Sequence, residues 1–286
     1  MKLQPGISAI CACKNRTKNL SVAIGSWLKH AEIDEIIIVD WDSDESLDSV
    51  GKRDPRIKII SVKDEPHWEL TRAYNLAARF VSKSKILKLD CDYILGDNFF
   101  EHHPLEDNTI FYAGDRQKAR DANEAHIAGL LYLHTENFGA IRGYNEIMKG
   151  WGYDDDDIYM RLCVSGLTRR HICNDDIYHI RHNGIKNQLQ GFLRVLSNQK
   201  NIFISETYDW TKRGTLSEYT VCKDDTGGHL SLYFPKYGKK CLKKIRNKIS
   251  QKFFIQLGEG NFWKKMLTTK NKMQKIKKII SGAIDA

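Results

Sequence analysis

Acidic and imidazole side chains occur in three short groups along this chain, and the first has the residue types of a metal site. Asp90 and Asp92 close an apolar segment. If that segment is a strand, residues two apart project from the same face, so both carboxylates can converge on one cation. Hard divalent ions such as Mg²⁺ and Mn²⁺ prefer oxygen ligands and often share them with substrate phosphates. Acidic pairs are also common in solvated turns, so the pattern alone leaves both interpretations open.

The second and third groups add imidazoles and an acidic run. His179 and His182 stand three residues apart, and imidazole added to a carboxylate site favours Mn²⁺ over Mg²⁺. Residues 154–157 are four consecutive aspartates that follow a Gly-Trp-Gly turn centred on Trp151. Carboxylates at the start of a helix are stabilised by its dipole. One of them could serve as a general base while the tryptophan offers a platform for a sugar ring. A solvated acidic face is the alternative interpretation.

Alternating strands and helices are expected to position these groups. Apolar runs predict strands over 7–13, 35–40, 56–62 and 85–90, and helical spacing predicts helices over 19–30 and 69–80. This order favours an open α/β sheet with right-handed crossovers. Ligands bind such sheets at the carboxyl ends of the strands. The polar residues predicted to gather there are Asn15, Arg16, Asp40, Asp42, Asp64, Asp90 and Asp92.

The ordered motifs resemble those of one enzyme family. Residues 150–162 resemble the W-G-W-G-G-E-D-D-D-I-Y-x-R-L block of β-1,4-galactosyltransferases and related bacterial family 2-like glycosyltransferases. Residues 13–20 are similar to the family's F-R-N-R-x-x-x-L segment, and residues 72–75 to its R-A-x-x-x-N helix with one residue fewer. Asp90-Cys-Asp92 resembles its D-x-D, and residues 179–182 its M-I-R-H. The similarity covers about residues 5 to 190. It implies a GT-A fold, a Rossmann-like open mixed sheet flanked by helices.

The resemblance also implies a role for individual residues. Asp92 and His182 would bind Mn²⁺ (or Mg²⁺), with His179, which stands where the family has methionine, as a third ligand. Asp155 would be the catalytic base. Trp151 would stack on the acceptor, and Asp154 and Asp156 would contact its hydroxyls. The implied nucleotide-sugar contacts are Lys14, Arg16, Asp40, Asp42, Arg72 and Asp90. Tyr153 and Asp154 replace a glycine and a glutamate of the family, so the identity of the acceptor stays open.

These roles imply an inverting, UDP-sugar-dependent transferase. It would move a sugar of the galactose, N-acetylgalactosamine or glucose type to a saccharide or lipid-linked acceptor in bacterial surface polysaccharide synthesis. One alternative is a retaining transferase of the polypeptide N-acetylgalactosaminyltransferase kind, although a retaining enzyme needs no base in the acidic run. Another is a non-catalytic nucleotide-sugar-binding membrane scaffold, which has no need of Asp90, Asp92, Asp155 and His182 together.

Charge and composition divide the chain into parts. We expect a GT-A domain over 1–206, a β-rich or irregular extension over 207–234 with a hairpin, and a basic amphipathic helical tail over 235–286. The tail holds 15 basic and 2 acidic residues of a chain whose net charge is +9, so the body is mildly acidic, which argues against a nucleic-acid partner. Basic amphipathic helices bind anionic membranes. The expected location is therefore cytoplasmic, peripheral to the inner face of the cell membrane. The alternative is a helical pair packed on the catalytic domain.

Overall fold

Four parallel strands form the centre of the computed structural model, which describes residues 2–51, 53–181, 188–212, 220–223, 230–233 and 236–259. Each central strand contains a run of apolar residues, and these runs are largely buried, as is typical of parallel strands covered on both faces. The strands are β1 Gln4–Cys13, β2 Ile33–Trp41, β3 Ile57–Lys63 and β4 Lys83–Asp90. The four predicted strands are therefore confirmed.

The sheet continues on both sides of this centre, in the order β10-β11-β3-β2-β1-β4-β7-β6-β8. On one side β11 runs parallel to β3 and antiparallel to β10, so the predicted hairpin is present and joins the main sheet. On the other side β7 runs antiparallel to β4 and to β6, which makes the sheet mixed. The outer strands are β6 Ile110–Ala113, β7 Leu131–His134, β8 Thr168–His171, β10 Thr220–Lys223 and β11 Leu230–Tyr233. A separate pair is formed by β5 Tyr93–Leu95 and β9 Ile177–His179.

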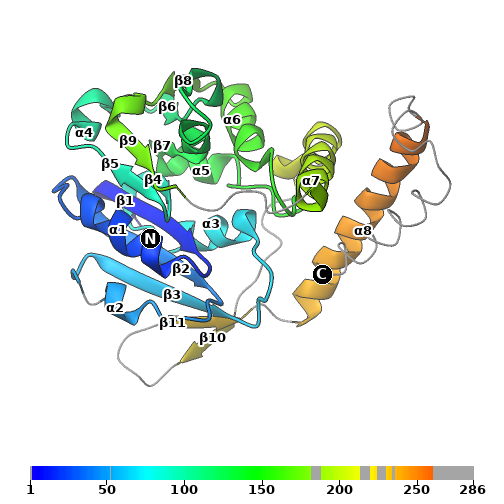
Figure 1. Ribbon diagram of the computed structural model, residues 1–286, viewed down its shortest axis with the longest axis horizontal. Helices are drawn as coiled ribbons and strands as arrows, with labels where there is room; N and C mark the ends of the chain where they lie inside the picture. Colours follow the sequence, from blue (N-terminus) through cyan, green and yellow to red (C-terminus); the bar gives the residue numbers. More distant parts are fainter. Residues whose placement is uncertain are drawn as a thin grey trace.

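Helices cover both faces of the sheet (Figure 1), and the sheet separates the two main apolar clusters of the core. On one face α1 Thr17–Trp27 buries Leu20, Ile24 and Trp27. On the other face lies α3 Leu70–Ala78. The predicted helices at 19–30 and 69–80 are thus confirmed. The remaining helices are α2 Asp48–Gly51, α4 Phe99–His102, α5 Thr135–Ala140, α6 Asp154–Val164, α7 Gln188–Thr207 and α8 Lys236–Glu259, with short 3₁₀ turns η1 Arg116–Lys118, η2 Glu124–Gly129, η3 Asn174–Asp176 and η4 Trp210–Lys212.

The helix α8 lies beside α7 at the edge of the molecule (Figure 1) and packs its apolar side on the body. Leu242, Ile249 and Phe253 are buried there. Arg246 pairs with Glu69 at 2.8 Å and donates to the backbone carbonyls of residues 146–148. These apolar side chains, which were expected to enter a membrane, are therefore covered by protein. This agrees with the alternative prediction, in which the tail packs on the catalytic domain. The second predicted tail segment lies outside the described residues.

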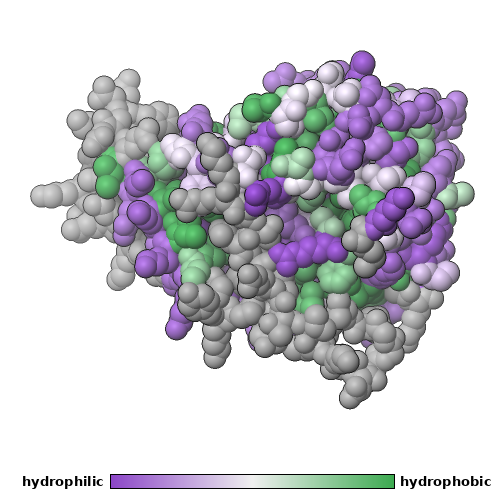
Figure 2. Space-filling view, turned by 180° about the vertical axis from the view of Figure 1, so that it is seen from behind, coloured by the Kyte–Doolittle hydropathy of each residue, from purple (hydrophilic) through white to green (hydrophobic). Residues whose placement is uncertain are grey.

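None of the described helices combines the length and the apolarity that a bilayer span requires. The face seen in Figure 2 is mainly hydrophilic, with hydrophobic colour in patches between polar areas.

Candidate active site

The loops that follow β1, β2 and β3 each hold one residue in the left-handed conformation. These residues are Asn15 (φ 55°), Asp42 (φ 54°) and Asp64 (φ 59°). The conformation costs most residues about 1 kcal/mol or more, and Asn and Asp tolerate it best. The Asn15 amide donates to Asp44 Oδ2 at 2.9 Å, and its Oδ1 accepts the Asp44 N–H at 2.8 Å. The strand ends therefore form a preorganised rim where α/β sheets bind ligands.

Two cations that are predicted to contact the nucleotide hold this rim together. Lys14 Nζ donates to the carbonyl oxygens of Trp41 (2.9 Å), of the following residue (2.6 Å) and of Glu65 (3.1 Å). The Arg72 guanidinium is 2% exposed, binds both carboxylate oxygens of Glu65 at 3.0 and 3.1 Å, and lies over the Trp41 ring. Lys14 and Arg72 therefore position the rim in this structure, and their contacts with a nucleotide stay predictions.

Three other predicted nucleotide contacts lie at the same edge. Arg16 is half-buried and directly precedes α1. Asp40 is buried and accepts the Ser43 N–H at 3.2 Å, and burial raises the pKa of Asp40. Asp42 accepts the Glu65 N–H at 3.0 Å. The ends of β1 and β2 thus bring all three together, and their contacts with a nucleotide stay predictions.

Lys88 is a site residue that the sequence patterns did not reveal. It lies on β4, is 0% exposed, and places Nζ 2.8 Å from Asp90 Oδ1 and 3.6 Å from Asp155 Oδ1. Nζ also donates to the Gly129 carbonyl at 2.7 Å, and the Tyr144 hydroxyl donates to Asp155 Oδ1 at 3.2 Å. Lys88 therefore joins the end of β4 to the start of α6. A lysine within a buried strand was the available signal, since lysine is rarely buried without a partner.

The charges in this cluster shift one another's pKa values. Burial alone would lower the pKa of Lys88, but the carboxylates of Asp155 and Asp90 outweigh it and raise that pKa, so the ammonium stays charged. Burial raises the pKa of Asp155, and Lys88 opposes this rise. Burial and the neighbouring charge of Asp155 raise the pKa of Asp154 to about 8. Of these two aspartates, Asp154 therefore holds its proton up to about pH 8, whereas Lys88 favours the carboxylate form of Asp155.

A carboxylate and an imidazole meet next to this cluster. Asp92 Oδ2 lies 3.5 Å from His179 Nε2, and both side chains are buried. Asn123 Nδ2 donates to the His179 carbonyl, which orients the amide so that Asn123 Oδ1 lies 2.9 Å from His179 Nδ1. An amide oxygen only accepts, so Nδ1 carries a proton, and Nε2 is the ring nitrogen that faces Asp92.

This donor pair fits a metal such as Mn²⁺. The third predicted ligand, His182, lies outside the described residues. Within the ranges that the structure describes, no set of three His, Cys, Asp or Glu side chains is arranged to hold a metal.

The four aspartates at the start of α6 point in different directions. Asp154 is 8% exposed, whereas Asp156 is exposed. Asp157 is buried, pairs with Arg161 at 2.7 Å and accepts a hydrogen bond from Ser205 at 2.6 Å, so it is structural. Asp154 and Asp155 are thus the members of the run that face the Lys88 cluster.

The turn before α6 presents the predicted acceptor platform. Trp151 is 43% exposed between Gly150 and Gly152, whose φ values are +84° and +98°. A Cβ at either glycine would collide with Ser197 or Asn198 of α7, so the turn can pack this closely only with glycine.

Comparisons with known proteins show what this part of the chain is similar to. Residues 110–183, which contain Trp151, the acidic run and His179, match the family model described as the N-terminal domain of galactosyltransferase. A curated relative, beta-1,4-galactosyltransferase 7 of Drosophila melanogaster, is 24% identical over 114 residues. The match covers 39% of this chain and 35% of the relative, so the chain spans about a third of that protein's length.

Two solved structures share the fold. A mannosyltransferase of Pyrobaculum calidifontis, in complex with GDP-Man and Mn²⁺, has a TM-score of 0.52 at 12% identity and covers 71% of this chain and 65% of its own. GalNAc-T7 with UDP, GalNAc and Mn²⁺ has a TM-score of 0.51 at 15% identity and covers 67% and 48%. The chain has the GT-A glycosyltransferase fold, and the resemblance to galactosyltransferases inferred from its motifs is confirmed.

Proposed function

We propose that this chain is a metal-dependent, inverting glycosyltransferase that uses a UDP-sugar of the galactose, N-acetylgalactosamine or glucose type. The observation that carries the proposal is the position of Asp155. Its carboxylate lies beside Lys88 and Tyr144 and close to Asp90, which stands two residues before Asp92 of the Asp92–His179 pair. The GT-A fold and the galactosyltransferase-family match support the reaction class.

The proposed reaction needs a base that is ionised and close to the acceptor. Asp155 takes the proton of an acceptor hydroxyl as that oxygen forms a bond to the anomeric carbon. The bond from this carbon to the diphosphate breaks, and its electron pair leaves with UDP. Attack from the face opposite the leaving group inverts the anomeric configuration. Lys88 supports the carboxylate form of Asp155, and a general base contributes about 10²–10⁴-fold.

The donor side of the site needs positive charge for the leaving diphosphate. Asp92 and His179 would hold Mn²⁺, with His182 as the further predicted ligand, and the bound ion would supply that charge. Tyr74 donates to Asp90 Oδ1 at 2.6 Å and thereby fixes the first carboxylate of the D-x-D. The proposed contacts with the nucleotide sugar are Arg16, Asp40, Asp42 and Asp90.

The proposal is tested by binding and turnover. We expect calorimetry to detect UDP binding that requires Mn²⁺ and is lost in Asp92→Ala, and a panel of UDP-sugars to identify a donor that releases UDP. Asp155→Asn should keep UDP affinity within a few-fold and reduce transfer by at least about 100-fold. The control is Asp175→Asn, which removes an exposed carboxylate that is 75% accessible. Metal-independent binding, or full transfer by Asp155→Asn, would contradict the proposal.

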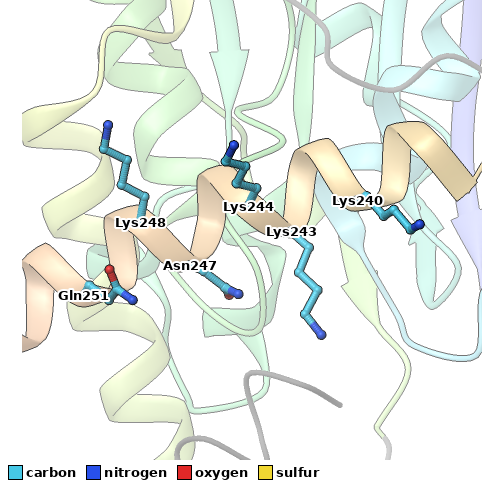
Figure 3. Close-up of a pocket in the computed structure, with 6 residues that line it drawn as sticks. All are labelled: Lys240, Lys243, Lys244, Asn247, Lys248 and Gln251. Carbon is cyan, nitrogen blue, oxygen red and sulfur yellow. The ribbon is translucent and has the colours of Figure 1, made fainter.

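We further propose that the exposed lysines of α8 hold the enzyme at an anionic membrane surface, where lipid-linked acceptors of bacterial surface polysaccharides are made. An open hollow on α8 is lined by Lys240, Lys243, Lys244, Asn247, Lys248 and Gln251 (Figure 3). No candidate catalytic residue lines it. Because the opposite side of the helix is buried, this attachment would rest on charge rather than on insertion.

Liposome co-sedimentation tests this attachment. Replacing Lys240, Lys244 and Lys248 by glutamine should release the protein from anionic vesicles and leave UDP binding unchanged. Raising the salt concentration should have the same effect on the parent protein. Binding that resists both changes would exclude an electrostatic role for α8.

A further inference from the structure

The exposed ring of Trp151 is flanked by two arginines from different elements. Arg194 Cζ lies 5.3 Å and Arg116 Cζ 6.0 Å from the ring centre. Arg116 belongs to the short turn η1 and is exposed, and Arg194 belongs to α7 and is half-buried. Both distances are at the long end of the range for cation–π contacts.

The close packing of the Gly150–Gly152 turn on α7 explains why Arg194 is there. Ser197 donates to the Lys149 carbonyl at 3.0 Å, and Asn201 donates to the Gly152 carbonyl at 2.7 Å. Residues three and four apart lie on the same helix face, so Arg194, one turn before Ser197, also faces the turn. The position of its guanidinium beside the ring is therefore built into the fold.

Both guanidinium groups lack a carboxylate partner within ion-pair distance among the residues that the structure describes. Neighbouring arginines differ: Arg161 pairs with Asp157, and Arg120 pairs with Glu124. Two cations held near one ring repel each other, and an anion placed between or beside them relieves that repulsion. Neither guanidinium group would have to break an ion pair with a described residue. A ligand that arrives can therefore move both groups towards the edge of the ring.

We propose that the acceptor is an anionic saccharide whose sugar ring stacks on Trp151 and whose carboxylate or phosphate group is bound by Arg116 and Arg194. The planar guanidinium fork matches both of these anions. A neutral sugar would need the aromatic face and the aspartates of α6, but neither arginine. This inference rests on the proposed function, because it takes Trp151 as the acceptor platform.

Matched acceptor probes separate charge from shape. The para-nitrophenyl β-glucoside, the corresponding glucuronide and the glucoside 6-phosphate differ only in the group on C6. We expect calorimetry with UDP and Mn²⁺ present to give at least about tenfold tighter binding of the glucuronide or the phosphate than of the neutral glucoside. Whichever of the two charged probes binds more tightly shows whether the site prefers a carboxylate or a phosphate.

Single variants test the two arginines. Arg116→Gln and Arg194→Gln should each remove most of the preference while leaving the affinity for the neutral glucoside unchanged. Arg53→Gln, an exposed arginine after α2, should change neither. Equal binding of the three probes, no binding of any, or an equal loss for charged and neutral probes would overturn the proposal.

A separate readout tests the proposed function. Metal-dependent UDP release from the donor in the absence of acceptor should be the same in the parent and in both arginine variants. If the parent releases no UDP from any donor, the proposed function fails. If release is normal but the probes are bound equally, only the anionic acceptor is refuted.

Discussion

Replacing Lys88 by methionine tests the link between the donor side of the site and the base. Methionine has a similar length and no charge, so the substitution removes the ammonium while it retains most of the buried volume. The variant leaves Asp155 with Tyr144 as its hydrogen-bond partner, and leaves Asp90 with Tyr74. Burial and the charges of Asp90 and Asp156 still raise the pKa of Asp155.

The expected magnitude follows from the distances. At 3.6 Å and an effective dielectric constant of about 20, the attraction between Lys88 and Asp155 is about 4 to 5 kcal/mol before desolvation is counted. Desolvation of the ammonium offsets part of this attraction. If only about 1.4 kcal/mol survives, the pKa of Asp155 rises by about one unit in the variant. Loss of one partner of a buried pair also reduces the free energy of unfolding by about 3–5 kcal/mol, which a domain of ordinary stability tolerates at low temperature.

The assay is the pH dependence of kcat under saturating donor and acceptor. A general base acts in its ionised form, so the rate falls as the pH drops through the pKa of Asp155. Removing Lys88 should move this acidic limb at least about one unit towards higher pH and lower kcat at neutral pH. Lys58→Met, which breaks a lysine–carboxylate pair with Glu35 on β3 and β2, should leave the limb in place. An unshifted limb in Lys88→Met, with activity lowered equally at all pH values, would refute this account.

Three further predictions concern the neighbours of this cluster. Asp154→Asn should raise the melting temperature increasingly between pH 3.8 and about 8, because the folded parent keeps a proton there that the unfolded chain releases, and a gain independent of pH would contradict this. Arg246→Met should lower the free energy of unfolding in urea by about 3–5 kcal/mol at neutral pH. Burial alone would raise the pKa of Glu69, but Arg246 outweighs burial and holds that pKa at about 2. The difference in unfolding free energy between parent and variant should therefore shrink as the pH falls from 4.5 towards 2. Asn123→Ala should weaken Mn²⁺ binding about 10–100-fold by calorimetry, because His179 loses the partner that orients its ring, and unchanged affinity would remove His179 from the ligand set.

The central fold could be predicted from the sequence because parallel strands buried on both faces appear as continuous apolar runs. That rule found β1 to β4 and the two helices that cover them. The same rule missed Lys88, since a single charge inside the apolar run Ile86–Leu89 does not stop that run from being read as a buried strand. Its partner Asp155 is 67 positions away, and no local pattern reports a contact over that separation.

The roles of other charged residues depended on partners that spacing cannot supply. Arg72 matched a family motif in position, but Glu65, seven residues earlier, accepts hydrogen bonds from both of its terminal nitrogens, Nη1 and Nη2. The amphipathic pattern of α8 predicted that one side of the helix is covered, and Leu242 and Ile249 are indeed buried. Such a stripe is the same whether a membrane or a protein surface covers it, so the sequence could not decide between the two.

The charge balance of the site explains why these groups act together. Asp90, Asp92, Asp154 and Asp155 converge on a region where Lys88 is the cation that contacts two of them. The charge of Arg72 is balanced in the rim by the carboxylate of Glu65. Part of the excess is removed by the proton that Asp154 keeps up to a pKa of about 8. The negative charge that is left lies at Asp92, beside the imidazole of His179, where a divalent cation and a diphosphate would complete the balance. Lys88 thus serves the base, and the Asp92–His179 pair serves the leaving group, so the two halves of the proposed reaction draw on separate sources of positive charge.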